Sequence, residues 1–255
     1  MNMATDLQKA SFWKRIAAWL FDGILLGILA VACGVLVSWL LGYDAHSERL
    51  EAAYARYEQE YGVVFEISLE EYEAMTEADR IQYDTAYQAL IADREAMYDY
   101  NMMLSKTLVI LSVSALLAVA VIEWLIPLKL GNGQTIGKKI FGLALIRSDG
   151  VQLNNLQLFT RSMLGKGTVE TMIPMLIILM IYWGTMGVAG TVVLFALFFG
   201  QLASLLFTRS NCAIHDLMAG TVVVDYASQT IFRSTEDLIA YQKKVAAERA
   251  ARAPY

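Results

Sequence analysis

The chain has 255 residues, of which 57% are hydrophobic and 18% are charged. Soluble domains have about 45–50% apolar and about 25% charged residues, so this composition favours a protein of the lipid bilayer. The mean hydropathy of +0.45 agrees with that class. Three prolines and two cysteines exclude a collagen-like, proline-rich or disulfide-stapled chain. The net charge of −5 argues against nucleic-acid binding.

The charge is strongly segregated along the chain. The segment between residues 42 and 105 has four basic and fifteen acidic residues, a balance of −11. The rest of the chain carries +6. An acidic insert therefore interrupts an otherwise basic membrane protein.

Four hydrophobic runs predict four transmembrane helices. The first is 16–41, about 39 Å as a helix against about 30 Å of hydrocarbon, and the second is 107–128. The first run is too long for a cleaved signal peptide. No charge occurs from residue 171 to 207, a run of 37 residues that is too long for one span. Glycines at 184, 187 and 190 divide it, which predicts spans at 168–183 and 188–207.

The basic residues predict the orientation of these spans. Short loops rich in Lys and Arg stay on the cytoplasmic side of a membrane. The basic segments are 1–15, 129–167 and 208–255, and four spans put all of them on one side. We therefore expect a multi-pass protein of the cell membrane, with both termini cytoplasmic and the acidic segment 42–106 outside.

The insert 42–106 is predicted to be an extracytoplasmic helical hairpin. It is rich in helix-forming residues and lacks proline. Ser68 to Glu71 has the capping-box pattern, and Thr76 to Asp79 is a looser version of it. We expect two helices that extend the first two spans and pack through tyrosine faces. A cation-binding acidic surface is the alternative, although such faces are usually only solvated.

A small cytoplasmic β element is expected beside the four helices. The segment 141–147 predicts a strand, Asp149-Gly150 a hairpin turn, and the next residues a returning strand. The β-branched run Thr221 to Asp225 could join it in a sheet. Residues 234–253 predict a polar helix, most simply a solvated tail. The expected fold class is thus an all-α membrane protein with four transmembrane helices, a helical hairpin insert and a small β element.

Ionisable residues inside the spans are the first candidates for function, because each costs roughly 2.5–3.5 kcal/mol to insert. Asp22 needs a donor from another helix or a proton, so it is either a polar clamp between helices or a proton- or cation-binding carboxylate. Glu123 is the second candidate. Glu170 is expected to cap the third helix, where the helix N-terminus stabilises a carboxylate.

Other motifs exclude several chemistries. The run Gly131 to Lys139 is not a phosphate loop, because Asn132 and Lys139 replace its glycine and its Ser or Thr. The two histidines, His46 and His215, fall on opposite predicted sides and cannot share a metal site. The chain also lacks a nucleophile elbow. We therefore expect no catalytic residue, cofactor or metal site, and no enzyme; His215-Asp216 is interpreted as an interfacial hydrogen-bond network.

Three motifs resemble those of the RDD family of membrane proteins over about residues 12–225, apart from the insert. They are RIAAWLFDG at Arg15–Gly23, GQTIGKKIFGL at Gly133–Leu143 and HDLMAGTVVV at His215–Val224. The resemblance implies a family polar network and a cytoplasmic loop motif. The network comprises Arg15, Asp22, His215 and Asp216, and the loop motif comprises Gly133, Thr135, Gly137 and Lys138. It also implies transport of an unidentified ligand, with cation/proton exchange proposed for some members.

Two functions remain open at this point. The first is transport or ion exchange, which with only four spans would require a homo-oligomer. The second is a non-transporting accessory subunit whose external insert binds a membrane or extracytoplasmic protein. We further hypothesise that Arg15 forms a bridge with Asp216, with Asp225 as the next best partner.

Overall fold

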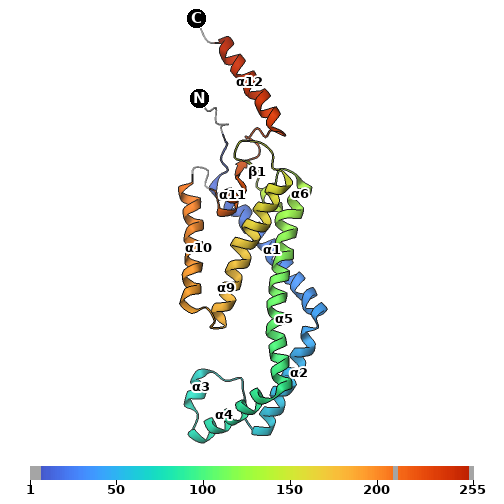
Figure 1. Ribbon diagram of the computed structural model, residues 1–255, viewed down its shortest axis with the longest axis vertical. Helices are drawn as coiled ribbons and strands as arrows, with labels where there is room; N and C mark the ends of the chain where they lie inside the picture. The colour runs from blue at the N-terminus through green and yellow to red at the C-terminus, as the bar shows by residue number, and fades with distance from the viewer. Residues whose placement is uncertain (1–6, 209–211, 253–255) are drawn as a thin grey trace. The chain divides into compact units, whose positions relative to one another are not determined.

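The computed structural model describes residues 7–208 and 212–252 (Figure 1). The chain is mostly helical and divides into two compact units. One comprises Met1–Ala30 with Ala115–Tyr255, and the other comprises Val31–Ser114. The boundaries between the units fall inside two long helices, and each unit is described by itself below.

Within the described residues, four helices are long and apolar enough to cross a membrane, as the sequence predicts. They are α1 (Phe12–Leu41), the continuous helix Arg94–Leu130, the continuous helix Asn155–Tyr182, and α10 (Gly187–Phe207). Such helices imply a lipid environment for a multi-pass chain. The third begins at Asn155 instead of at residue 168, because Asn154 caps a helix whose first half is polar.

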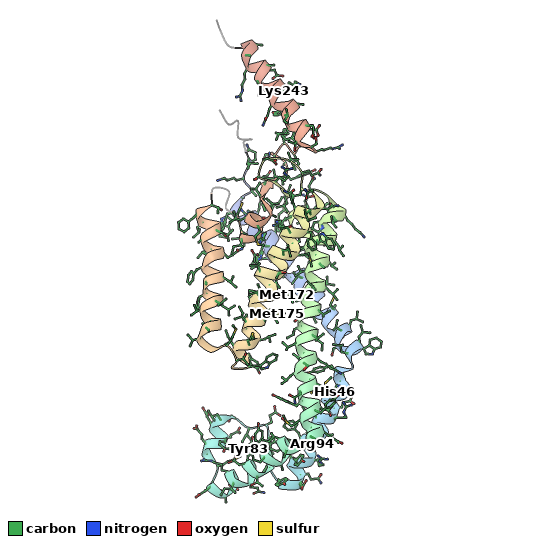
Figure 2. All side chains as sticks on the ribbon, in the orientation of Figure 1. His46, Tyr83, Arg94, Met172, Met175 and Lys243 are labelled. Atoms are coloured by element: carbon green, nitrogen blue, oxygen red, sulfur yellow. The ribbon has the colours of Figure 1, made fainter. Side chains whose placement is uncertain are left out.

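The second and third of these helices each contain a π-helical segment, in which a backbone N–H bonds to the carbonyl five residues earlier. The second comprises α5 (Arg94–Val119), η1 (Ala120–Leu125) and α6 (Ile126–Leu130). The third comprises α8 (Asn155–Phe159), η2 (Thr160–Met172) and α9 (Ile173–Tyr182). Pro127 and Pro174 follow the two π-helical segments, where the regular ladder is already interrupted. Figure 2 shows Met172 and Met175 on one continuous helix across the η2–α9 junction.

The unit Val31–Ser114 contains three helices between α1 and α5, where the sequence predicts two. They are α2 (Tyr43–Tyr61), α3 (Leu69–Ala74) and α4 (Glu77–Ala92). Ser68 and Glu71 form the expected capping box, and Thr76 accepts from the Asp79 N–H. Each cap begins a separate helix, which accounts for the additional element. Helices α2 and α4 pack against each other, and His46 and Tyr83, on these two helices, are labelled in Figure 2.

Aromatic rings hold this unit together. The Phe65 ring makes edge contacts with Tyr54 of α2 and with Tyr83 and Tyr87 of α4, at centroid distances of 5.6, 5.8 and 6.4 Å. Offset and edge-to-face pairs at these separations are favourable. Tyrosines of α2 and α4 therefore both contact Phe65 of the connecting segment, instead of packing directly on each other in these ring contacts.

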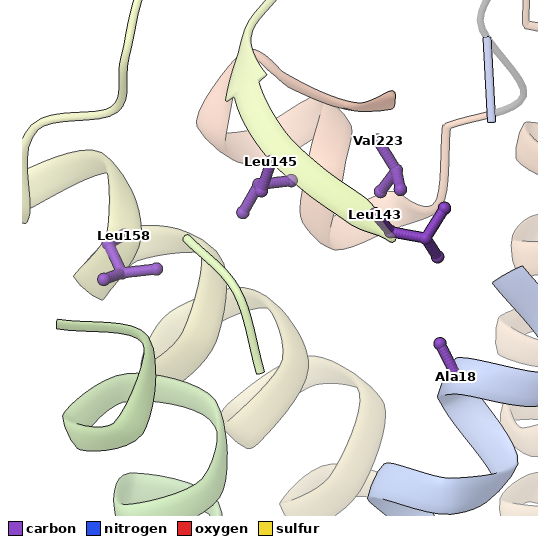
Figure 3. Packing of buried hydrophobic residues seen from close by; sticks show 5 residues of the cluster. All are labelled: Ala18, Leu143, Leu145, Leu158 and Val223. Carbon is purple, nitrogen blue, oxygen red and sulfur yellow. The ribbon is translucent and has the colours of Figure 1, made fainter. Parts of the chain in front are cut away.

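The two strands, β1 (Leu143–Arg147) and β2 (Thr221–Asp225), pair antiparallel with Leu143 opposite Asp225. The predicted return after Gly150 makes only isolated bridges, from Val151 and Gln152, so β2 replaces it as the partner of β1. Successive side chains of a strand point to opposite faces. One face packs into a buried cluster shown in Figure 3, and the other face packs into a second buried cluster. The first cluster contains Ala18, Leu143, Leu145, Leu158 and Val223.

Short helices and a polar helix complete the unit Met1–Ala30 with Ala115–Tyr255. Helices α7 (Ile136–Ile140) and α11 (Ile214–Ala219) each precede a strand. The polar helix expected near the C-terminus is α12 (Thr235–Arg252). It is not wholly solvated, because Leu238 is buried with Val151 and Phe232.

Candidate functional site

A cavity of about 630 Å³ lies within the unit Met1–Ala30 with Ala115–Tyr255. Its apolar lining comes mainly from α1 and α10. Its polar lining comes from α1, α7, η2, α10 and α11. The apolar side chains include Phe12, Ile16, Trp19, Leu202, Leu205 and Leu206, and the polar ones are Arg15, Asp22, Lys138, Arg161, Lys166, Glu170, Gln201, His215 and Asp216. The cavity thus brings charged groups together with the apolar faces of membrane helices.

The π-helical segment η2 supplies three of the charged residues. Arg161, Lys166 and Glu170 are spaced by five and four residues, so the wider turn can bring them to one face. The side chains confirm the altered register, because the Thr168 and Thr171 hydroxyls donate to carbonyls five residues back. Segments of this kind are rare and occur often at functional sites.

Arg161 and Asp216 form the central ion pair. Arg161 Nε donates to Asp216 Oδ1 at 2.8 Å, and the two residues are 3% and 1% exposed. The Thr221 hydroxyl donates to the same oxygen at 3.1 Å. Burial alone would raise the pKa of Asp216, but the Arg161 guanidinium outweighs it and holds the pKa well below its usual range.

The bridge expected between Arg15 and Asp216 is not the main contact of Asp216. Arg15 Nη2 lies 4.0 Å from Asp216 Oδ2, which is an ion pair but longer than a hydrogen bond. Asp225 pairs with Lys14 at 2.9 Å. Arg161 was not among the predicted site residues, because it lies in the segment 129–167 that is expected to be a cytoplasmic loop. The capping box of Asn154 with Gln157 was the signal that a helix begins there.

His215 connects this pair to Glu170. His215 Nδ1 lies 2.8 Å from Glu170 Oε2, and Nε2 lies 2.9 Å from Arg161 Nη2. A guanidinium can only donate, so Nε2 accepts and the neutral ring carries its proton on Nδ1. Glu170 also accepts from the His215 backbone N–H at 3.1 Å. It lies inside η2, so the expected role as a helix N-cap is wrong.

Gly165 allows η2 to approach α11 this closely. A Cβ atom at this position would lie 2.6 Å from His215 Cβ and 2.8 Å from its Cα. Both distances are shorter than real Cβ contacts. A larger residue would therefore separate the helix that carries Arg161 from the helix that carries Asp216.

Asp22 is held by the loop motif. The Thr135 hydroxyl donates to Asp22 Oδ2 at 2.5 Å, and the Gly137 N–H donates to Oδ1 at 2.8 Å. Asp22 is 2% exposed. A Cβ atom at Gly137 would lie 2.5 Å from the Ala18 carbonyl oxygen. Gly137 belongs to α7 and Thr135 caps it, so Asp22 has a donor from another helix, which is one of the two alternatives that the sequence left open.

Gly133 and Lys138, the other residues of the loop motif, also have defined surroundings. Gly133 has a φ of +60°, which glycine adopts readily, and it packs against Leu145. Lys138 Nζ donates to the Thr135 hydroxyl at 3.2 Å. Burial lowers the pKa of Lys138 to about 8, although the carboxylate of Glu123 opposes this effect.

Glu123 lies in η1 and is 1% exposed. Lys166 Nζ donates to its Oε1, while Lys138 Nζ lies 4.0 Å from its Oε2. Within residues 7–208 and 212–252, Glu123 Oε2 has no hydrogen-bond partner. A row of polar contacts thus runs from Asp22 through Thr135 and Lys138 to Glu123 and Lys166, and it joins the two carboxylates that the sequence singled out.

The described part of the chain has no group of three His, Cys, Asp or Glu side chains that could hold a metal ion. Comparisons with curated proteins and with solved structures found no match. The model of the RDD family matches residues 9–220. This match covers most of the chain, including the cavity helices α1, η2 and α10 and the loop motif that binds Asp22, and the chain therefore belongs to the RDD family.

Proposed function

We propose that this protein is a transporter that exchanges a cation for a proton. The observation that supports the proposal is the row of polar contacts from Asp22 to Glu123. Ionisable groups in membrane helices are costly and usually functional. Asp22 lines the cavity, while Glu123 keeps one buried oxygen without a hydrogen-bond partner among the described residues. Asp22 and Glu123 are thus the sites proposed to bind the proton or the cation.

The contacts also provide a way to couple the two carboxylates. Ionised Asp22 accepts from the Thr135 hydroxyl, whose oxygen then accepts from Lys138. A proton on Asp22 Oδ2 would donate to that oxygen instead, because a hydroxyl rotates to suit its partners. The oxygen would then be a poorer acceptor for Lys138 Nζ, which has Glu123 Oε2 only 4.0 Å away. Protonation of Asp22 would in this way strengthen the Lys138–Glu123 pair.

The arrangement in the membrane follows from the charge pattern. Both termini and the basic segments 129–167 and 208–255 are proposed to be cytoplasmic, in the cell membrane. Helices α2 and α4 then form the external hairpin. Because four helices are few for alternating access, we propose a homo-oligomer as the transporting unit. We also propose that the protein is not an enzyme.

The test is flux in liposomes that contain the purified protein, with dyes for protons and for sodium. Asp22→Asn should abolish proton-coupled flux while the folded protein still inserts. Glu123→Gln should also reduce it. Glu236→Gln, which neutralises an exposed acid of α12, is the matched control and should leave flux unchanged. Wild-type flux in both Asp22→Asn and Glu123→Gln would contradict the proposed sites, and no flux by the wild type would contradict exchange itself.

The accessory-subunit function is favoured by a different observation. Val64, Leu69 and Ile81 in the insert are 59%, 73% and 62% exposed. A minimal ion path does not require such a segment, whereas exposed apolar groups are common at protein contacts. A photo-cross-linking residue at position 81 should then trap a membrane or extracytoplasmic protein. The same residue at exposed position 139 should not trap that protein.

A further inference from the structure

The cavity has an apolar part that differs from an ordinary lipid-facing surface. Trp19 of α1 and Leu206 of α10 are each 62% exposed, and both line the cavity. Exposed apolar residues on membrane helices normally contact the acyl chains of bulk lipid, and they do not by themselves indicate a binding site. Here, however, they adjoin charged side chains in one concave space of about 630 Å³. That combination suits an amphiphile, which has one ionic and one apolar end.

Most of the cations that line the cavity are already paired. Arg161 bonds to Asp216, Lys166 to Glu123, and Lys138 to Thr135. Arg15 differs from these. Its guanidinium makes the 4.0 Å ion pair with Asp216 and no side-chain hydrogen bond to another residue of the described chain. A guanidinium has five N–H donors in a fork that matches a phosphate group.

A second hydrogen-bond donor comes from α10. Gln201 of α10 lines the same cavity, and its Oε1 accepts from the Ile214 N–H at 3.1 Å. Its amide nitrogen has no hydrogen-bond partner elsewhere in the described residues. The cavity therefore combines unused N–H donors from two helices, α1 and α10, whereas its carboxylates are already bonded to the protein.

We propose that the cavity binds one anionic phospholipid, with its phosphate on Arg15 and Gln201 and an acyl chain along the apolar side chains of α1 and α10. A guanidinium with free donors binds a phosphate group, and it favours a headgroup without a second, positive charge over a zwitterionic one. The apolar side chains belong to helices long enough to cross a membrane, so the lipid can enter from the bilayer. This proposal rests on Arg15, Gln201 and the apolar side chains and not on the proposed ion exchange, although Asp22 lines the same cavity.

The experiment measures lipid binding to the delipidated full-length protein by native mass spectrometry. Phosphatidylglycerol should bind about tenfold more tightly than phosphatidylcholine, because the choline ammonium offsets part of the attraction between the lipid phosphate and Arg15. Arg15→Gln should remove this preference. Lys139→Gln, which removes an exposed charge beside the buried Lys138, is the control and should retain it. Equal loss in Arg15→Gln and Lys139→Gln would show only nonspecific attraction and would overturn the site.

Two further measurements test the placement of the acyl chain and distinguish a lipid site from a free-anion site. Leu202→Trp fills the apolar part without changing a charge, and it should weaken binding of both lipids; unchanged binding would overturn the placement of the acyl chain. Inorganic phosphate should not displace phosphatidylglycerol at equal concentration. Displacement would mean a free-anion site instead of a lipid site. If Arg15→Gln fails to fold, these two measurements still decide the proposal.

Discussion

Arg161 and Asp216 are 55 residues apart in the chain, yet Arg161 Nε donates to Asp216 Oδ1 at 2.8 Å, and both side chains are almost fully buried. The pair fastens η2 to α11, and His215 extends the contact to Glu170. A buried charge that loses its partner is strongly unfavourable. The stability of the unit Met1–Ala30 with Ala115–Tyr255 should therefore depend on this pair more than on Arg15.

Substitutions at this pair give the first prediction. Arg161→Ala and Asp216→Ala should each lower the free energy of unfolding by about 3–5 kcal/mol. The double variant should lose less stability than the sum of the two single losses, because each single substitution already removes the same interaction. Arg15→Ala should cost less than Arg161→Ala, since Arg15 is 4.0 Å from Asp216. Denaturant unfolding in detergent measures all four; additive losses for Arg161 and Asp216 would contradict the pairing.

The second prediction concerns two close approaches at glycine. Gly137→Ala places a methyl group against the Ala18 carbonyl, and Gly165→Ala places one against His215. Each should lower stability by about 1–3 kcal/mol through overpacking. Gly27→Ala is the control, because no atom lies within 4 Å of its added Cβ. Thermal unfolding of the three purified variants is the measurement, and equal midpoints would count against the packing described here.

The third prediction tests the proposed orientation. In a variant that lacks Cys33 and Cys212, single cysteines are placed at Ser47 and Ser148. An impermeant thiol reagent added to intact cells should label position 47 only. Position 148 should be labelled after the cells are opened, which confirms that it is reactive. Labelling of position 148 alone on intact cells would reverse the topology.

The fourth prediction is a pH dependence in the insert. Backbone N–H groups of Ala96 and Glu95 donate to Asp93, and they hold the pKa of its carboxyl below its usual range, helped by Arg56. A folded-state pKa below the unfolded value of about 3.9 means that the contribution to stability is present above that value. It is lost as pH falls through the lower folded-state pKa.

Asp93→Asn should therefore reduce thermal stability at pH 7 and reduce it less at pH 2, which lies below the unfolded-state pKa. Glu48→Gln, a change at an exposed acid of α2, should reduce it less at pH 7. Unfolding of the full-length protein in detergent can be followed by circular dichroism at both pH values. An equal loss at both pH values in Asp93→Asn would assign the effect to packing instead of charge.

Local patterns in the sequence predicted local structure well. The caps at Ser68 and Thr76 are confirmed, and so is the need of Asp22 for donors, since a buried carboxylate must find them somewhere. The partner of Asp216 could not be found in this way. Nothing in the sequence specifies which of the basic residues of the segment 129–167 approaches Asp216, because tertiary packing decides a contact between such distant positions. Hydrophobic periodicity also gave no sign of the π-helical segments.

The long π-helical segment η2 has a consequence for how this helix tolerates insertions and deletions. In an α-helix, one removed residue rotates everything beyond it by about 100°. A π-helical turn holds more residues than an α-helical turn. If one residue within Thr160–Met172 is removed, one π-helical turn can become an α-helical turn, and α9 keeps its position. Arg161 and Glu170 would then no longer share a face. Length variants of this helix should thus separate insertion into the membrane, which would survive, from assembly of the charged cavity, which would not.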